Sequence, residues 1–232
     1  MGQSIDATLM RDIVGWDVRT WSKAVDFWAT KLDPNEAPLH AMEVGAGPGG
    51  PSLWLALQGH TVLCTNFQNT EGQARPLHDR YGVTGITYQD VDATRIPFEN
   101  QFDLIIFKSV LGGVGSQFEA QQRAVEGMLR ALKPGGRLLY AENLRSTWLH
   151  RAARAIAYRL RRSSWRFMSV REMHSLLAGF ESHELYTTGS LSLFGVTEGQ
   201  RAALAAVDDA VFNRLTPSRW RYVSYGIATK AR

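Results

Sequence analysis

A glycine-rich run at residues 43–50, Glu-Val-Gly-Ala-Gly-Pro-Gly-Gly, is the stretch best suited to bind a ligand. It lies between an apolar, strand-like stretch at 39–44 and a helix-like stretch at 52–58. A strand, a glycine turn and a helix in this order form a nucleotide-binding loop. Gly45 and Gly47 let the backbone approach the ligand, and the N–H groups of the next helix point at it. The glycine spacing also satisfies the dinucleotide fingerprint, so the loop alone does not identify the ligand.

Three further stretches add polar groups or turns near the expected strand ends. The second predicted strand ends at Asn66, where a nucleotide-binding fold usually has an acidic residue for the ribose hydroxyls. Residues 92–98 read Asp-Ala-Thr-Arg-Ile-Pro-Phe and are followed by Phe-Asp at 102–103, and residues 132–136 read Leu-Lys-Pro-Gly-Gly. Together with the glycine loop, these stretches resemble the class I S-adenosylmethionine-dependent methyltransferases. The likeness covers about 39–142, and 169–187 more loosely.

The resemblance implies S-adenosylmethionine as cofactor, S-adenosylhomocysteine as product, and a small molecule as methyl acceptor. It also implies a role for each matching residue. Glu43 and the backbone of Gly45, Gly47 and Gly49 would hold the methionine portion, and Asn66 would face the ribose, with Phe67 beside the adenine. The adenine edge would be bound by Asp92 and the backbone N–H of Ala93, and the methionine amino group by the carbonyl of Lys108.

Asn66 departs from the family pattern, because an amide offers one acceptor where a carboxylate offers two. We therefore expect weaker ribose binding than in relatives with an acid at this position. Two of the assigned residues have alternative interpretations. Phe67 could be an ordinary core residue, and Asp92 could be a helix or turn cap.

Helix-like and strand-like patterns alternate along the chain, which predicts an α/β fold with helices on both faces of a mostly parallel sheet. The expected strands are 39–44, 61–66, 85–89, 102–107, 137–142, 180–187 and 222–230. The expected helices are one N-terminal helix around Trp16 to Trp28, then 51–58, 70–81, 117–132, 169–178 and 198–214. The resemblance implies a doubly wound, seven-strand, Rossmann-like methyltransferase fold with an antiparallel last strand and a helical cap over the acceptor.

A single domain is the expected organisation. Its parts would be a helical cap at 1–36, a cofactor-binding core at 37–143, a basic lid segment at 144–168, and the rest of the sheet with an inserted helix at 169–232. Hydrophobic residues make up 44% and charged residues 21%, as in ordinary soluble proteins. Cys64 is the only cysteine, which excludes disulfides within the chain and cysteine-rich metal sites and favours the cytoplasm. We see no secretory signal and no run of about 18 apolar residues that could cross a bilayer.

The net charge of +4 is concentrated in one segment, because residues 145–171 contain eight arginines and no acidic residue. Apolar residues recur there at helical spacing, with Arg151, Arg154, Arg161 and Arg162 on the opposite face. Three interpretations stay open: a lid with a solvated arginine face, a site for an anionic substrate, and contact with a membrane surface. Nucleic acid is not an expected partner, since the basicity is local and the fourth strand is followed by Lys-Ser-Val-Leu rather than an amino-methylating motif.

Catalysis needs a nucleophile aligned with the methyl–sulfur bond, and a general base helps when the acceptor is a hydroxyl. Of the six histidines, only His150 closely follows the fifth strand at the edge where ligands bind, so it is the leading base candidate. Glu142 and Asn143, which end that strand, are the next candidates. These features favour O-methylation. The rival hypotheses are a nicotinamide-dependent oxidoreductase and a non-catalytic, cofactor-binding partner of another subunit.

Overall fold

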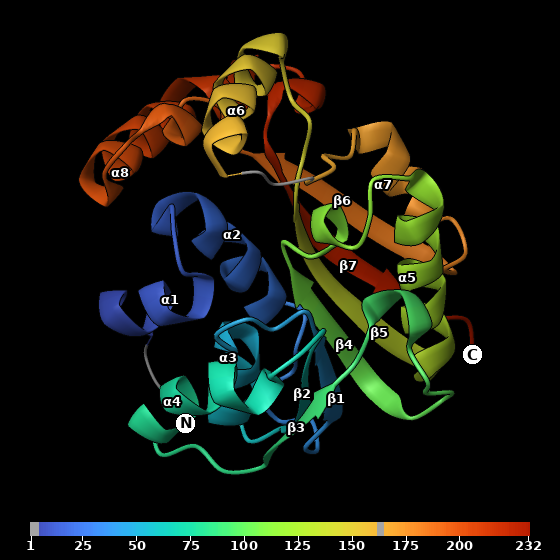
Figure 1. The fold of residues 1–232 in the computed structure, drawn as a ribbon. Helices are drawn as coiled ribbons and strands as arrows, with labels where there is room; N and C mark the ends of the chain where they lie inside the picture. Colours follow the sequence, from blue (N-terminus) through green and yellow to red (C-terminus); the bar gives the residue numbers. More distant parts are fainter. Residues whose placement is uncertain (1–4, 162–164) are drawn as a thin grey trace.

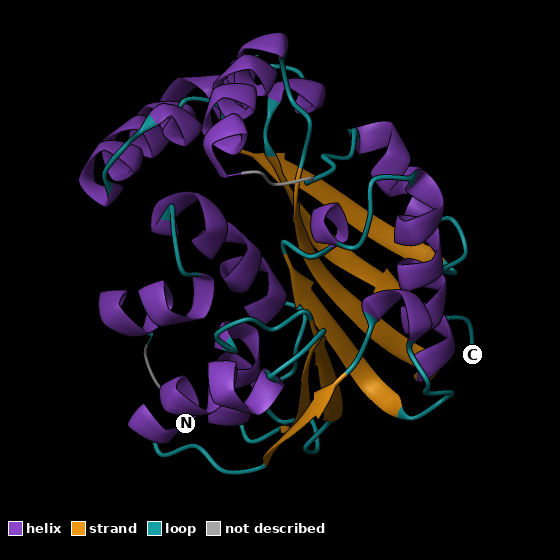
Figure 2. Ribbon diagram, viewed as in Figure 1, coloured by secondary structure: helices purple, strands orange, loops and turns teal. Residues whose placement is uncertain are grey.

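A seven-stranded sheet with the strand order β3-β2-β1-β4-β5-β7-β6 organises the computed structural model, which describes residues 5–161 and 165–232 (Figure 1, Figure 2). The strands are β1 His40–Val44, β2 Thr61–Asn66, β3 Ile86–Asp90, β4 Phe102–Lys108, β5 Leu132–Asn143, β6 Ser182–Thr188 and β7 Val223–Thr229. Strands β1 to β5 pair in parallel, whereas β7 runs antiparallel to both β5 and β6. The predicted fold class and the antiparallel last strand are therefore confirmed.

Helices cover both faces of the sheet (Figure 2). On one face lie α1 Ala7–Val14, α2 Val18–Ala29, α3 Gly50–Leu57 and α4 Thr70–Arg80, and all four contribute to a core with alternate residues of β1, β4 and β5. On the other face lie α5 Phe118–Ala131 and α7 Val170–Leu177, which pack in a second core with the intervening strand residues. The alternation of side chains along each strand supplies both cores at once.

Two helices, not the single one predicted, form the N-terminal region. The chain turns at Gly15, whose φ of 85° closes α1, and at Asp17, which also has a positive φ before α2 begins. Helix α2 buries Trp21 and Trp28 against the sheet, and Trp28 Nε1 donates to the carbonyl of Gly226 at 3.1 Å. Trp21 and Trp28 thus lie on the packing face of α2.

The fifth strand starts at Leu132, five residues before the predicted start. Pro134 and the two following glycines do end α5, as predicted, but they lie inside the strand. Gly135 takes a φ of 74°, the pairing with β4 shifts register between Phe102 and Leu104, and the Lys230 N–H bonds the Gly136 carbonyl at 2.9 Å. This irregular start depends on a partner almost one hundred residues away in sequence.

The segment after β5 crosses over the top of the sheet (Figure 1). It contains α6 Trp148–Arg161, returns to pair Met168 beside Leu144, and then enters α7 through a capping box between Ser169 and Glu172. Helix α8 Glu198–Val207 continues through a π-helical turn at Asp208–Phe212 into α9 Asn213–Leu215, so the predicted helical run 198–214 is interrupted. None of the helices in the described ranges is long and apolar enough to cross a membrane.

Candidate functional site

The glycine loop between β1 and α3 has the backbone geometry that its sequence predicts. Gly45, Gly47 and Gly49 have φ values of 66°, 51° and 81°, a region that residues with a Cβ rarely adopt. A Cβ on Gly45 would also lie 2.6 Å from the side chain of Val110, which follows β4. The loop therefore needs glycine both for its conformation and for the close approach of β4.

Glu43 supports this loop from below. Its carboxylate is buried and accepts hydrogen bonds from the N–H of Ser52 at 2.8 Å and from the Ser52 hydroxyl at 2.5 Å. Burial raises the pKa of Glu43 to about 8, against the opposing effect of these bonds and of the Lys108 charge. Glu43 thus ties the end of β1 to the first turn of α3 rather than facing open space.

His78 holds the far end of the loop. Its Nε2 donates to the Gly49 carbonyl at 2.9 Å, and its Nδ1 then accepts from the Tyr88 hydroxyl at 2.8 Å. Burial lowers the pKa of His78, which favours the neutral ring that this pair of bonds requires. His78 was predicted only as a helix residue, so its contact with the glycine loop was missed.

Helix α1 closes over the start of α3. A Cβ on Gly50 would collide with the carbonyl oxygen of Ile13, so α1 and the glycine loop touch through their backbones. Gly50, rather than contacting a ligand, makes room for this N-terminal helix.

The end of β2 presents Asn66 and Phe67 on the same side as the glycine loop. The Asn66 N–H donates to the Thr70 hydroxyl at 3.0 Å, which in turn donates to the Asp90 carboxylate at 2.7 Å. The Asn66 amide Nδ2 donates to Gln73 at 3.0 Å, which leaves its Oδ1 directed away from that bond. Phe67 is 68% exposed, so the interpretation as a core residue is wrong.

Asp92 and Ala93 begin a short 3₁₀ turn after β3. Oδ1 of Asp92 accepts from the N–H of Thr94 at 2.8 Å and from its hydroxyl at 2.7 Å, which lowers the pKa of Asp92. The alternative interpretation of Asp92 as a turn cap is therefore correct for Oδ1. Asp92 also lines a cleft, so the capping bonds fix its carboxylate at the cleft wall.

That cleft, of about 500 Å³, opens at the carboxyl ends of β1, β2, β3 and β4. Six of the nine residues predicted to bind a cofactor line it: Gly45, Gly47, Asn66, Phe67, Asp92 and Ala93. The remaining wall is formed by Val91, Thr94, Ser109, Val110, Gly113, Val114 and Trp165. The other three predicted residues do not line the cleft. Glu43 supports the loop from behind, and Gly49 lies at the end of the loop, where it is bonded to His78. Lys108 is replaced in the cleft wall by its neighbour Ser109.

The side chain of Lys108 points to the opposite side of β4 from Phe107, toward α2. Its Nζ lies 4.4 Å from the ring centroid of Trp21, and its ammonium makes no hydrogen bond or ion pair within the described ranges. Burial lowers the pKa of Lys108 to about 8, while the charges of Glu142 and Glu43 act in the opposite direction. This cation thus balances two buried carboxyl groups behind the loops that form the cleft.

Glu142 fixes the loop that follows β4. Its Oε2 accepts from the N–H groups of Val110 and Leu111 at 2.8 and 2.7 Å, and its Oε1 accepts from the N–H of Asn143 at 2.7 Å. In the same loop, Ser109 has a left-handed backbone with a φ of 57°. Its hydroxyl oxygen accepts a hydrogen bond from the side-chain amide of Asn143 at 2.6 Å. Glu142 is fully buried, and this burial raises its pKa to about 7. This geometry is that of a positioning residue.

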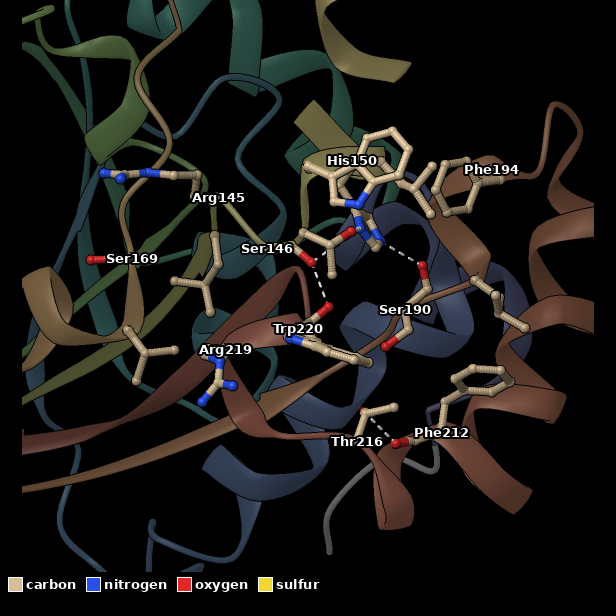
Figure 3. A pocket seen from close by; sticks show the side chains of 16 residues that line it. Arg145, Ser146, His150, Ser169, Ser190, Phe194, Phe212, Thr216, Arg219 and Trp220 are labelled. Carbon is tan, nitrogen blue, oxygen red and sulfur yellow. Dashed lines mark hydrogen bonds between the residues drawn. The ribbon is translucent and has the colours of Figure 1, made fainter. Parts of the chain in front are cut away.

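His150 lies at the predicted edge of the sheet but lines a neighbouring cavity instead of the cleft (Figure 3). Its Nε2 donates to the Ser190 carbonyl at 2.7 Å, and its Nδ1 lies 2.6 Å from the Thr147 hydroxyl, which donates to it. The ring is 4% exposed and packs beside Phe194 and Tyr222, and burial lowers its pKa. As arranged, both nitrogens are occupied, so His150 could accept a proton only after one of these bonds opens.

The arginine segment is less free than its sequence suggests. Arg145 and Arg166 both pair with Glu172, at 2.8 and 2.5 Å. Arg154, predicted on a polar face, is only 7% exposed, with its guanidinium 3.9 Å from the Phe167 ring centroid and bonded to the Leu144 carbonyl. Its assignment to the polar face is therefore wrong. The predicted side-chain positions of Arg161 and Arg162 lie outside what the structure describes.

Trp165, at the end of this segment, is a wall of the cleft. It lies directly on Gly112 and Gly113, where a Cβ on Gly112 would collide with its indole ring, and the next N–H bonds the Gly112 carbonyl at 2.8 Å. Trp165 therefore encloses the cleft on this side.

Comparison with known proteins gives this arrangement a family context. Residues 42–140 match a family described as a methyltransferase domain. A ubiquinone/menaquinone biosynthesis C-methyltransferase of Pseudomonas putida is 30% identical over 58% of this chain and 52% of its own length. A probable chloroplastic tocopherol O-methyltransferase of Oryza sativa is 27% identical over 63% of this chain and 39% of its own length. The chain thus spans about half the length, or less, of these curated relatives.

Solved structures share the fold at low sequence identity. A phosphoethanolamine N-methyltransferase 2 of Haemonchus contortus, in complex with S-adenosylhomocysteine, has a TM-score of 0.64 at 15% identity, covering 91% of this chain and 53% of that one. The YcgJ protein of Bacillus subtilis has a TM-score of 0.64 at 16% identity, covering 91% and 99%. Over about nine tenths of its length, this chain therefore shares the fold of these structures, one of which is a methyltransferase.

Proposed function

Because residues 42–140 match a methyltransferase domain and a cleft lies over their glycine loop, we propose that the protein transfers a methyl group from S-adenosylmethionine to a small-molecule acceptor. S-adenosylhomocysteine would be the second product. The observation that carries the proposal is that six residues assigned from the sequence converge on one cleft from three strand ends. A random match to the glycine pattern would not place Asn66 and Asp92 beside it.

The cleft fits this cofactor in size and in the character of its walls. Its volume of about 500 Å³ lies in the range of small-molecule sites. The exposed ring of Phe67 offers a stacking surface for adenine, Asp92 with the backbone of Ala93 offers an acceptor and a donor for the base edge, and Asn66 faces the ribose. The methionine portion would lie along the backbone at Gly45 and Gly47, near the carbonyl of Lys108.

The bound cofactor would supply an electrophilic methyl group on a positively charged sulfur. The chain would position the acceptor and keep water away, which can supply several kcal/mol of the barrier. Trp165 and the loop fixed by Glu142 are suited to that role, since they form the wall beyond Ser109.

The finer proposal is that the acceptor atom is a hydroxyl oxygen, whose proton must leave during transfer. The Lys-Ser-Val-Leu stretch after β4 supports it, because this stretch lacks the motif of amino-methylating enzymes. The sequence similarity to a tocopherol O-methyltransferase supports it too, while the similarity to a C-methyltransferase makes carbon the alternative. We retain His150 as the proposed base, acting after its ring leaves Thr147 or Ser190.

Calorimetric titration with S-adenosylhomocysteine and, separately, with NADH tests the proposal. We expect binding of S-adenosylhomocysteine, weakened at least about tenfold by Asp92→Asn, since a charged acceptor contributes about 1.5–3 kcal/mol. Asp79→Asn, at an exposed position of α4, is the matched control. Binding of NADH alone would support the oxidoreductase hypothesis instead. Incubation with S-adenosylmethionine and a panel of phenols and hydroxy acids would then identify acceptors by release of S-adenosylhomocysteine.

A further inference from the structure

Exposed apolar side chains gather at one end of the molecule, around the start of α6 and in the segment between β6 and β7. Within the described ranges, eight of the ten large hydrophobic side chains that are exposed lie there: Trp148, Leu149, Phe194, Val196, Val207, Val211, Leu215 and Trp220. Trp148 is 73% and Leu215 79% exposed. Monomeric proteins rarely leave such a concentration open to water without an interaction partner.

Four of these side chains, Trp148, Leu149, Phe194 and Trp220, form what we call the apolar rim. All four line a second cavity of about 540 Å³, mostly walled by apolar atoms (Figure 3). This cavity shares no lining residue with the glycine-loop cleft, and the chain at 165–168 passes between Trp165 in the cleft wall and Ser169 in the cavity wall. The rim therefore lies outside the glycine-loop cleft, although His150, the proposed base, lines the same second cavity.

Arginines accompany the exposed apolar residues. Arg151 lies one helical turn after Trp148, Arg214 precedes Leu215, and Arg219 precedes Trp220. Arg151, Arg214 and Arg219 are exposed, and none of them pairs with a carboxylate in the part of the chain that the structure describes. Long arginine side chains beside tryptophan and leucine are typical of surfaces that meet lipid headgroups.

The three acidic residues of the same region are bonded to other parts of the protein and to none of these three arginines. Glu198 accepts from the N–H groups of Asp17 and Val18 at 3.0 and 2.6 Å, and Asp208 accepts from the N–H groups of residues 190–192. Asp209 pairs with Arg19 and Lys23. Residues 145–222 contain twelve arginines and six acidic residues, so this part of the chain is net positive and the remainder carries the excess of acids.

From this juxtaposition we propose that the apolar rim and its three arginines dock the protein on an anionic phospholipid bilayer. The tryptophans would enter the headgroup region, the arginines would pair with lipid phosphates, and the cavity would admit apolar chains between Trp148 and Trp220. Charge complementarity selects this occupant over a second copy of the chain. A two-fold contact through the same face would bring the arginines of both copies together.

Co-sedimentation with vesicles tests the proposal directly. The full chain is expected to pellet with vesicles of equal parts phosphatidylcholine and phosphatidylglycerol, less so at high salt, and only weakly with phosphatidylcholine alone. Replacing Arg151, Arg214 and Arg219 with glutamine should weaken partitioning about fivefold for each arginine and about a hundredfold together. Arg232→Gln, near the C-terminus at the other end of the sheet, is the matched control for each single change (Figure 1).

Insertion of the apolar rim into the bilayer can be measured separately, by quenching of tryptophan fluorescence. Acyl-chain-brominated phosphatidylglycerol should quench tryptophan fluorescence of the wild-type protein, and the double variant Trp148→Ala, Trp220→Ala should lose that quenching together with at least about tenfold of its partitioning. Every variant should bind S-adenosylhomocysteine as the wild type does, which separates this inference from folding and from the proposed reaction.

Equal pelleting with neutral and anionic vesicles, or no pelleting at physiological salt, would overturn membrane docking. So would unchanged partitioning of the arginine variant. A concentration-dependent dimer in analytical ultracentrifugation that the rim variant abolishes would instead assign this face to a second copy of the chain.

Discussion

Replacement of Glu142 by glutamine is the sharpest test of how the cleft is built. Glu142 accepts three backbone N–H bonds with two oxygens, at 2.7 to 2.8 Å. Glutamine has one carbonyl oxygen, so either Asn143 or the pair Val110 and Leu111 would face an amide NH₂ group instead of an acceptor. A buried N–H group left without an acceptor costs about 1–3 kcal/mol, and one or two such groups are left in this variant.

The expected loss of unfolding free energy in Glu142→Gln is about 2 to 4 kcal/mol near pH ~6, measured by urea denaturation. Because Ser109 and Val110 line the cleft, the affinity for S-adenosylhomocysteine should also fall, by about tenfold. Glu126→Gln, at an exposed position of α5, is the matched control and should change the unfolding free energy by less than about 0.5 kcal/mol.

The pH dependence of this difference has a definite sign. Burial raises the pKa of Glu142 from its ordinary value of 4.5 to about 7, so between these values the folded state holds a proton that the unfolded state has released. The stability that this proton contributes is fully present below pH 4.5 and is lost as the pH rises through about 7, up to about 3 kcal/mol in all. The difference in unfolding free energy between the wild type and Glu142→Gln should therefore become smaller toward pH ~8. A difference in unfolding free energy that grows with pH would refute the role of Glu142 in positioning the loop after β4. So would a variant that is as stable as the wild type and binds S-adenosylhomocysteine with unchanged affinity.

Three further changes test other parts of the site. His78→Ala removes the donor to the Gly49 carbonyl, so urea denaturation should show a loss of about 1–3 kcal/mol of unfolding free energy. Calorimetric titration should show weaker binding of S-adenosylhomocysteine. An unchanged affinity would show that His78 does not support the loop. Asn66→Asp should tighten S-adenosylhomocysteine binding several-fold, because a charged acceptor contributes about 0.5–2 kcal/mol more than a neutral one, and identical calorimetric constants would contradict the ribose assignment. His150→Ala should lower turnover at least about tenfold while S-adenosylhomocysteine still binds normally, and wild-type turnover would exclude His150 as base.

The glycine loop could be predicted because its requirements are local. Gly45, Gly47 and Gly49 each need a left-handed backbone, and that need is visible in the residue type itself. The ends of β2 and β4 were also predictable from apolar runs of strand length. Gly15 and Asp17, a helix stop and a helix start, indicate two N-terminal helices, whereas only one is predicted from the sequence, around Trp16 to Trp28.

Contacts that depend on how elements are rotated and packed could not be predicted. His78 reaches Gly49 because of the angle of α4 against α3, and nothing in its neighbours along the sequence indicates that angle. Asp90 supports Asn66 through Thr70, across a strand pairing that only the folded sheet creates. The face of Lys108 was predictable in principle, since strand alternation places it with Leu104 and Ile106 in front of α2.

A crystal structure of the protein grown with S-adenosylhomocysteine tests the central claim most directly. The adenine should lie beside Phe67 with its edge at Asp92 and Ala93, the ribose at Asn66, and the amino-acid end over the glycine loop. Density for the ligand at any other place, or a cleft closed by its own side chains at saturating ligand, would contradict the account.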